Sequence, residues 1–344
     1  MLAQRIEALV VQTIPRIPTG LARRLAARKR VIVDGQTLDP HMQLLLGLDP
    51  REGGFETLGS VQEAREVYQR MIDLLERPED PPAATHDRRL PGDIPVRIYE
   101  PRVAGPRPGV VYFHGGGFVI GDLDTHDGLC RRIANGVGAT VVAVDYRLAP
   151  EHPFPAGPDD CVAATRWVVE NAASLGIDPA RIALAGDSAG GNLAAVVSQE
   201  VEGIAFQLLI YPGADKAMQT ESEQLFGKGF GLDQTTVEWF FDLYANGASP
   251  ADPRISPNRS TRLARSPKTH IALAGFDVLR DEGAALGRSL QKAGVECVIE
   301  AHESLTHGFV HFTKIPGCDR GVERLVTILR RELATHFPTA RVPL

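Results

Sequence analysis

The spacing of apolar residues changes once along this chain, close to Pro81 and Pro82. Before the two prolines, apolar residues recur every three or four positions, as in LARRLAARKR and SVQEAREVYQRMIDLLE, and this period predicts helices. After them, short runs rich in Val, Ile and Tyr alternate with helix-length segments. This alternation predicts an α/β fold whose mostly parallel sheet is covered by helices on both faces.

The apolar runs and the segments between them define the expected elements. We expect strands at 94–99, 110–113, 141–145, 182–185, 206–211, 271–274 and 298–301, and helices at 125–137, 158–174, 189–201, 282–293 and 319–335. Residues 213–266 contain an aromatic helix pattern, TTVEWFFDLYA, but no convincing strand, and they are too long for a simple connection. We therefore predict a helical segment over 1–80, an α/β domain over 81–212 and 267–344, and an insertion over 213–266 that forms a lid with the N-terminal helices.

Composition narrows the classes of function. The 344 residues include 37 Lys and Arg against 43 Asp and Glu, a formal charge of −6, which argues against nucleic acid as a partner. No stretch reaches the roughly 20 apolar residues of a membrane span, and the N-terminus lacks a signal-peptide pattern. We therefore expect no stable membrane insertion and a cytoplasmic location. The four cysteines form no disulfide or metal motif and are expected to be reduced and mostly buried.

A basic segment near the N-terminus departs from this balance. Residues 16–30 carry several arginines opposite Leu21 and Leu25. The solvated face of a docking helix is the interpretation that we favour, and contact with an acidic membrane surface is the alternative.

The first of two glycine clusters is GDSAGG at 186–191, between the strand pattern ARIALA and the helix pattern AGGNLAAVV. A G-x-S-x-G pattern is weak by itself, but it is specific in this strand–turn–helix context. Flanking glycines leave room for the sharp turn that lifts the serine hydroxyl above the sheet. The helix N-terminus favours a developing oxyanion. Ser188 is therefore a candidate nucleophile.

The second glycine cluster, HGGGF at 114–118, directly follows the strand pattern GVVYF. A run of glycines lets the backbone approach a ligand and turn its N–H groups inward, as an oxyanion hole requires. A flexible turn is the alternative, which the serine turn downstream disfavours. A phosphate-binding loop is disfavoured because the pattern G-x-x-x-x-G-K-[ST] is missing.

A serine nucleophile needs a base, which in the α/β-hydrolase order follows the serine and the acid. His270 and His302 fall within strand patterns, where burial is expected. His307 lies in LTHGF, just beyond a strand, and is the best candidate. His311 is expected to be a packing or surface residue.

The acid that orients the base is expected at the same edge of the sheet. Asp277 lies just past the strand pattern HIALAG, where the carboxyl ends of parallel strands meet. Asp281 and Glu282 come later and resemble a helix start, where carboxylates cap free N–H groups.

The motifs together resemble the hormone-sensitive-lipase-like esterases, a branch of the α/β-hydrolase superfamily. The resemblance rests on HGGGF at 114–118, LDTHD at 123–127, VDYRLAPEHPFPA at 144–156, GDSAGGN at 186–192, AGFDVLRDEG at 274–283 and HGF at 307–309. It implies an α/β-hydrolase fold with a helical cap and a serine carboxylesterase that needs no cofactor and no metal. The family often has a proline after the acid, where this chain has Val278.

The resemblance also implies a role for each matched position. Ser188 would be the nucleophile, His307 the base and Asp277 its partner. The oxyanion would be bound by the backbone N–H groups of Gly115, Gly116 and Ala189. The N-terminal helices and the insertion after 211 would form the cap, and a homodimer through the last strand and helix is compatible with the resemblance.

Substrate contacts are less well defined by the sequence. The candidates are Phe118, Asp187, Trp239 and Phe240, although plain lid packing explains the aromatic residues of the insertion equally well. A true interfacial lipase presents a large apolar surface, whereas this insertion is dotted with charge (Asp215, Lys216, Glu221, Glu223, Lys228, Asp233 and Glu238). We therefore predict that the partners are a small, water-soluble ester with a short to medium acyl chain, and water.

Three alternative interpretations stay open at this point. The acidic residues and the histidine of DLDTHD at 122–127 have the composition of a metal site, although a loop with a helix cap is simpler. A non-catalytic binding protein can use the same fold, but such proteins differ at the base position. A Ser–His–Asp triad does not by itself distinguish an ester from an amide or peptide bond.

Overall fold

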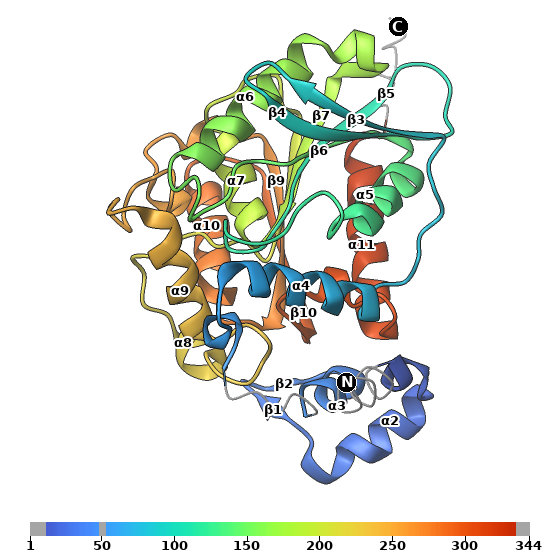
Figure 1. Cartoon of the computed structure of the whole chain (residues 1–344), viewed down its shortest axis with the longest axis vertical. Coiled ribbons are helices and arrows are strands. Elements are labelled where there is room, and N and C mark those ends of the chain that lie inside the picture. Colours follow the sequence, from blue (N-terminus) through green and yellow to red (C-terminus); the bar gives the residue numbers. More distant parts are fainter. Residues whose placement is uncertain (1–11, 48–52, 335–344) are drawn as a thin grey trace, which may run out of the picture.

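A computed structural model describes residues 12–47 and 53–334. Its centre is an eight-stranded sheet in the order β10-β9-β8-β7-β5-β6-β4-β3 (Figure 1). The strands are β3 (Ala84–Leu90), β4 (Ile94–Glu100), β5 (Arg107–Phe113), β6 (Thr140–Val144), β7 (Ile177–Asp187), β8 (Phe206–Ile210), β9 (Lys268–Phe276) and β10 (Cys297–Thr306). All neighbouring strands from β6 to β10 pair in parallel, whereas β4 is antiparallel to both β6 and β3. The predicted mostly parallel sheet is confirmed.

Helices cover both faces of this sheet, as the apolar runs predict. Along β5, Val110 and Tyr112 belong to one hydrophobic cluster, and Val111 and Phe113 belong to another. This alternation is the two-residue period of a strand buried on both faces. Helices α5 (Asp127–Ile133) and α11 (Pro316–Glu332) contribute to the first cluster, and α6 (Ala156–Glu170), α7 (Ala189–Val197) and α10 (Arg280–Lys292) contribute to the second (Figure 1).

An edge strand of the sheet and a short helix of the insertion were not expected from the sequence. Strand β3 reads ATHDRRL, and only Leu90 is buried, so its composition is that of a polar loop. It pairs with β4 alone and forms the edge of the sheet. Helix α8 (Glu221–Phe226) lies within the insertion, ahead of the aromatic helix pattern, and it begins with a capping box between Thr220 and Glu223.

In its described residues, the N-terminal segment contains three α-helices and a short hairpin. These are α2 (Thr19–Ala26), β1 (Ile32–Val33), β2 (Gln36–Thr37), α3 (Pro40–Leu46) and α4 (Val61–Leu75). In the insertion, α9 (Gln234–Ala245) is the expected aromatic helix. A third hydrophobic cluster joins α4 and α9 to the loop after β5, through residues that include Tyr68, Ile120 and Phe240. The two segments that we predicted to form a lid therefore share a core.

Two smaller observations bear on the sequence predictions. All four cysteines are buried and none forms a disulfide. Within residues 12–47 and 53–334, no helix has both the length and the apolar composition needed to cross a membrane.

Candidate active site

The serine turn joins the end of β7 to the start of α7. Ser188 lies between them with φ 56° and ψ −117°, a conformation that is costly for a residue with a side chain. A Cβ on Gly190 would overlap the carbonyl oxygen of Phe113, and one on Gly186 would overlap the backbone of Gly190. The turn therefore brings backbone segments so close together that only glycine fits at these two positions.

The three residues of the expected triad lie in one line of hydrogen bonds. His307 Nε2 is 2.9 Å from Ser188 Oγ, and His307 Nδ1 is 2.8 Å from Asp277 Oδ2. Asp277 follows β9 and His307 follows β10, so all three side chains come from the carboxyl edge of the parallel strands. A carboxylate at Nδ1 favours the tautomer whose Nε2 accepts the serine proton.

Buried neighbours hold this triad in place. The second oxygen of Asp277 accepts a hydrogen bond from the Leu279 N–H at 2.9 Å. The Tyr211 ring lies 4.5 Å from the His307 ring, centroid to centroid. The alternative acids serve the insertion, because Asp281 accepts from the Ser222 N–H and Glu282 from the Ala214 N–H. They are therefore not the caps of their own helix that we expected.

The glycine loop after β5 is anchored on the residue that precedes the nucleophile. The Gly115 N–H donates to Asp187 Oδ1 at 3.0 Å, and His126 Nε2 lies 3.2 Å from the same nitrogen. A Cβ on Gly115 would overlap the Asp187 carboxylate, so glycine is required for this approach. Because its N–H is already used, Gly115 is a poor oxyanion donor, and our prediction for it needs correction.

The next two glycines of the loop, Gly116 and Gly117, differ from Gly115 in that their N–H groups are not used by any described residue. In the described part of the chain, no protein acceptor receives a hydrogen bond from the N–H of Gly116, Gly117 or Ala189. Gly116 has φ 114° and Gly117 has φ 60°, both in the region that favours glycine. These three N–H groups replace the predicted set as candidate oxyanion donors.

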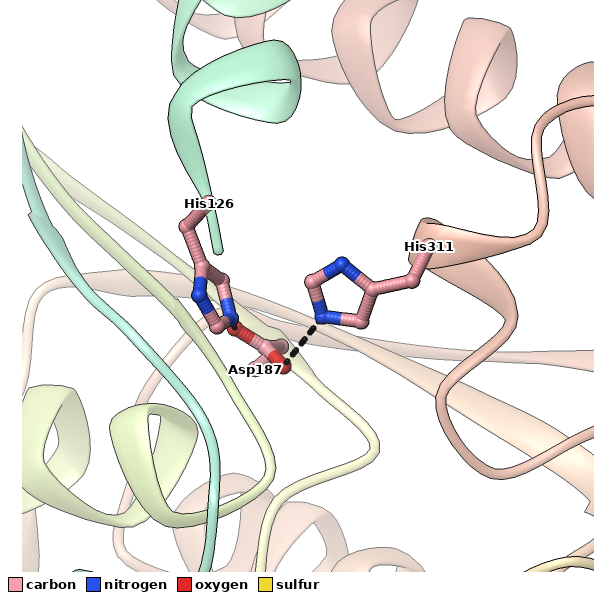
Figure 2. A group of neighbouring side chains, drawn as sticks. All are labelled: His126, Asp187 and His311. Carbon is pink, nitrogen blue, oxygen red and sulfur yellow. Dashed lines mark ion pairs between the residues drawn. The ribbon is translucent and has the colours of Figure 1, made fainter. Parts of the chain in front are cut away.

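Asp187 lies in a buried polar cluster behind the glycine loop (Figure 2). It accepts from the Tyr112 hydroxyl at 2.7 Å, and its oxygens lie 3.2 Å from His126 Nε2 and 3.8 Å from His311 Nε2. Burial alone would raise the pKa of Asp187, but the two imidazoles outweigh burial and hold that pKa well below its ordinary value. Asp187 is only 2% exposed, so the structure directs it into this cluster and away from the predicted role in substrate binding.

His311 is the second member of this cluster. It is 2% exposed, and its Nε2 lies 3.1 Å from the hydroxyl of Tyr68 on α4. His311 is therefore a packing residue, as one of our two interpretations had it, but it packs in a polar network. Burial also lowers the pKa of His114, the first residue of HGGGF, to about 4, so the His114 ring is neutral near pH 7.

The other candidate substrate residues lie along α9 and the glycine loop. Phe118 stacks on Tyr244 with ring centroids 3.9 Å apart. A Cβ on Gly117 would overlap the ring of Phe240, which in turn packs against the half-buried Trp239. These contacts place Phe118 and Phe240 at the loop with the candidate oxyanion donors, and a role for them and for Trp239 in binding substrate stays a prediction.

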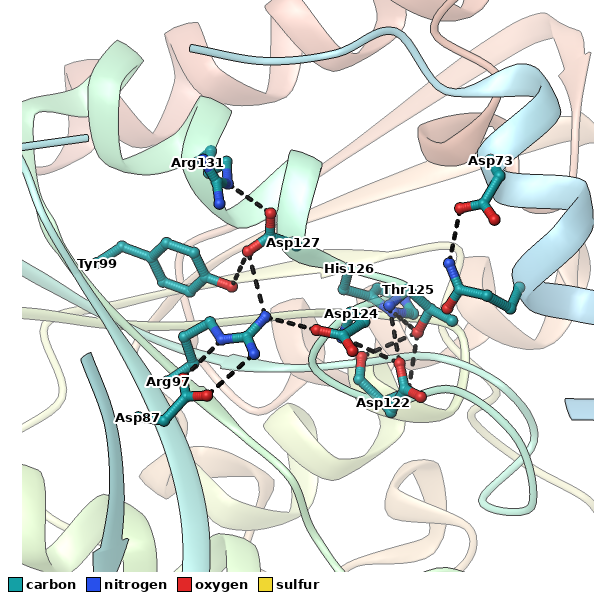
Figure 3. A network of polar contacts seen from close by, with 11 residues as sticks. Asp73, Asp87, Arg97, Tyr99, Asp122, Asp124, Thr125, His126, Asp127 and Arg131 are labelled. Carbon is teal, nitrogen blue, oxygen red and sulfur yellow. Dashed lines mark hydrogen bonds and ion pairs between the residues drawn. The ribbon is translucent and has the colours of Figure 1, made fainter. Parts of the chain in front are cut away.

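The side chains with the composition of a metal site have protein partners. Asp122 accepts hydrogen bonds from the N–H groups of Asp124 and Thr125, and Arg97 pairs with Asp124 and Asp127 (Figure 3). His126, Asp187 and His311 offer three ligand atoms within 4.8 Å of one another, but the polar cluster described above already engages both oxygens of the carboxylate. Both groups fit structural networks better than metal sites.

Comparison with known proteins identifies the family to which the chain belongs. Residues 110–311 match the model of the α/β hydrolase fold family. The chain belongs to the α/β-hydrolase family. The family's carboxylic ester hydrolase LipN of Mycobacterium tuberculosis is 39% identical, over 97% of this chain and 94% of LipN. Among solved α/β-hydrolases, a thermostable esterase from Pseudomonas putida ECU1011 has a TM-score of 0.82 and 32% identity, covering 87% of this chain and 98% of that chain.

A second curated relative is of the same kind. The ethyl acetate hydrolase of Pseudomonas putida is 36% identical over 79% of this α/β-hydrolase and 90% of its own length. The resemblance to hormone-sensitive-lipase-like esterases is therefore confirmed.

Some residues around the site were missed in the sequence. Gly117 was available in HGGGF, but the motif does not say which two glycines have free N–H groups. His126 stood in LDTHD and was considered only as a metal ligand, and no signal pointed to Tyr68, which comes from a helix far away in the chain.

We expect Asp187→Leu to reduce kcat on the order of 10²-fold, about the cost of losing one oxyanion donor, with a much smaller change in KM. The substitution keeps the branching of the side chain but removes the acceptor that positions the loop of Gly116 and Gly117. Asp187→Asn keeps an oxygen for the Gly115 N–H and should recover part of kcat. Steady-state kinetics, with circular dichroism as the check on folding, measures both, and a fully active Asp187→Leu variant would refute the anchoring role.

Proposed function

We propose that the chain is a serine carboxylesterase that hydrolyses small, water-soluble esters with short to medium acyl chains. The observation that carries the proposal is the line of hydrogen bonds from Asp277 through His307 to Ser188. The names of the relatives, which include a carboxylic ester hydrolase and an ethyl acetate hydrolase, support the same chemistry.

The first half of the reaction makes an acyl-enzyme. His307 Nε2 takes the proton of Ser188 Oγ as this oxygen attacks the ester carbonyl carbon. The carbonyl oxygen becomes an oxyanion, and we assign the N–H groups of Gly116, Gly117 and Ala189 as its donors. When the carbon–oxygen bond to the alcohol breaks, His307 returns the proton to the departing oxygen.

The second half releases the acid. Water enters the site of the alcohol, and His307 takes one of its protons as the water oxygen attacks the acyl carbon. The same N–H groups bind the second oxyanion. The bond to Ser188 Oγ then breaks, and this oxygen regains its proton from His307. Asp277 stabilises the imidazolium in both halves.

We assign the cap to the N-terminal segment and to 213–266. The hydrophobic cluster shared by α4, α9 and the loop after β5 supports this assignment. Phe118, Trp239 and Phe240 are then the side chains that we expect to limit the acyl or alcohol group. The charged residues of the insertion support a preference for dissolved esters over an emulsified lipid.

The two rival functions are less well supported. A non-catalytic binding protein does not require a histidine that contacts both the serine and the aspartate. An amide or peptide hydrolase would use the same triad, but both the curated relatives described above are named as ester hydrolases. A cytoplasmic location and a homodimer stay predictions.

We expect Ser188→Ala to reduce turnover of p-nitrophenyl acetate by about 10⁶-fold, which is the size of loss typical when a serine hydrolase loses its nucleophile. The nucleophilic oxygen is lost while the fold is kept. Ser174→Ala, at an exposed serine far from the triad, is the matched control and should keep full activity. Residual turnover of Ser188→Ala within tenfold of the parent would contradict the proposed role.

We expect the rate on a p-nitrophenyl butyrate to exceed that on emulsified long-chain triglyceride, because the charged insertion offers no apolar surface for an oil droplet. A matched butyrate ester and butyranilide separates esterase from amidase, and the ester should react faster. Faster hydrolysis of the triglyceride would refute the substrate class, and faster hydrolysis of the anilide would refute the bond class.

A further inference from the structure

Exposed apolar side chains gather on one short part of the surface. Among the residues that the structure describes, five large apolar side chains are exposed, and three of them lie between positions 21 and 32. Leu21 is 48% exposed and Leu25 is 50% exposed. Both are on α2, and their spacing of four residues places them one above the other on the same helix face. This face of α2 carries a leucine stripe that the described residues leave exposed.

A different face of α2 attaches the helix to the protein. Ala22 and Ala26 are buried, and α2 packs against α3. With 100° between successive residues, the alanines and the leucines form two neighbouring stripes, and Arg24 borders the leucines on the side away from the alanines. Figure 1 shows α2 at the outer edge of the N-terminal segment, on the side remote from the sheet. The leucine stripe therefore belongs to a docked helix and is not the core of an unfinished fold.

The charge of this region is opposite to that of the whole chain. Residues 16–30 contain six Lys and Arg and no Asp or Glu, in a chain with a formal charge of −6. Arg23, Arg24 and Lys29 are exposed and form no ion pair with a described carboxylate. Other exposed arginines, such as Arg89 and Arg324, do form such pairs. These cations are thus available to an anionic partner.

We propose that α2 docks the protein on an anionic lipid surface. In this arrangement Leu21 and Leu25 enter the boundary between headgroups and acyl chains, and Arg24, which borders them, contacts lipid phosphates. The leucines favour lipid over nucleic acid, because a nucleic-acid site of this size would present cations and polar groups, not an apolar stripe. The acidic remainder of the chain orients this face toward a negative surface.

The attachment of α2 gives the docking a consequence for the candidate esterase site. The Asp39 N–H, at the start of α3, donates to the carbonyl oxygen of Ser304 in β10 at 2.9 Å. Ser304 is three residues before His307. The N-terminal segment is therefore tied to the end of the sheet that carries the triad, and docking through α2 holds that end near the lipid surface.

The binding is expected to be weak and reversible, because a helix of eight residues offers only two leucines. Each Lys or Arg close to an anionic membrane contributes about a fivefold factor in partitioning. Binding should therefore fall as salt increases, because salt screens exposed charges.

The test is co-sedimentation of the full chain with vesicles, either of phosphatidylcholine alone or of phosphatidylcholine and phosphatidylglycerol in equal parts. One variant carries Leu21→Ser with Leu25→Ser, and a second carries Arg24→Gln. Val298→Ser is the matched control, because Val298 is 42% exposed on β10, next to acidic residues of the sequence. Turnover of a soluble ester reports that each variant is folded, and it is independent of vesicle binding.

We expect the parent and Val298→Ser to sediment with the anionic vesicles and not with the neutral ones. Arg24→Gln should weaken binding by about fivefold, and the leucine pair should weaken it as well, with ester turnover unchanged in both variants. No binding to the anionic vesicles would overturn the proposal. Equal loss in Val298→Ser, or leucine-dependent self-association without vesicle binding, would overturn it as well.

Discussion

The hydrogen bond from the Gly115 N–H to Asp187 joins the two glycine clusters of this protein, and the geometry of the site depends on it. Strands β5 and β7 are neighbours, with Phe113 paired to Gly186, so the loop after one strand meets the turn after the other. A backbone donor and a buried carboxylate fix this meeting more firmly than a contact between two mobile side chains. This hydrogen bond thereby fixes the position of the glycine loop relative to Ser188.

The same carboxylate links the site to the N-terminal segment. Asp187 is close to His311, and His311 contacts Tyr68 on α4. Phe240 of α9 lies so close to Gly117 that no side chain would fit there. Two segments that are far apart in the sequence are thus connected to the glycine loop, the insertion directly and the N-terminal segment through His311 and Asp187. A movement of the proposed cap would therefore shift the N–H groups that we propose as oxyanion donors.

The triad was predictable because each of its members follows a strongly apolar strand, and parallel strands end at one edge. The edge strand β3 was not predictable from its apolar pattern, since six of its seven residues are not buried. The oxyanion donors that we now propose are shifted by one residue along HGGGF from those that the motif suggested. Which N–H of HGGGF is free depends on a side chain that lies 72 residues away and on the local φ angles, and neither can be seen in the motif. His311 was hidden for the same reason, because its partners come from β7 and α4.

A structure of the protein after reaction with a phosphonate ester tests the central claim most directly. We expect phosphorus bound to Ser188 Oγ, with one phosphonyl oxygen within about 3 Å of the N–H groups of Gly116, Gly117 and Ala189. The Gly115 N–H should remain on Asp187. A phosphonyl oxygen bound by the Gly115 N–H, with Asp187 released, would contradict the central claim.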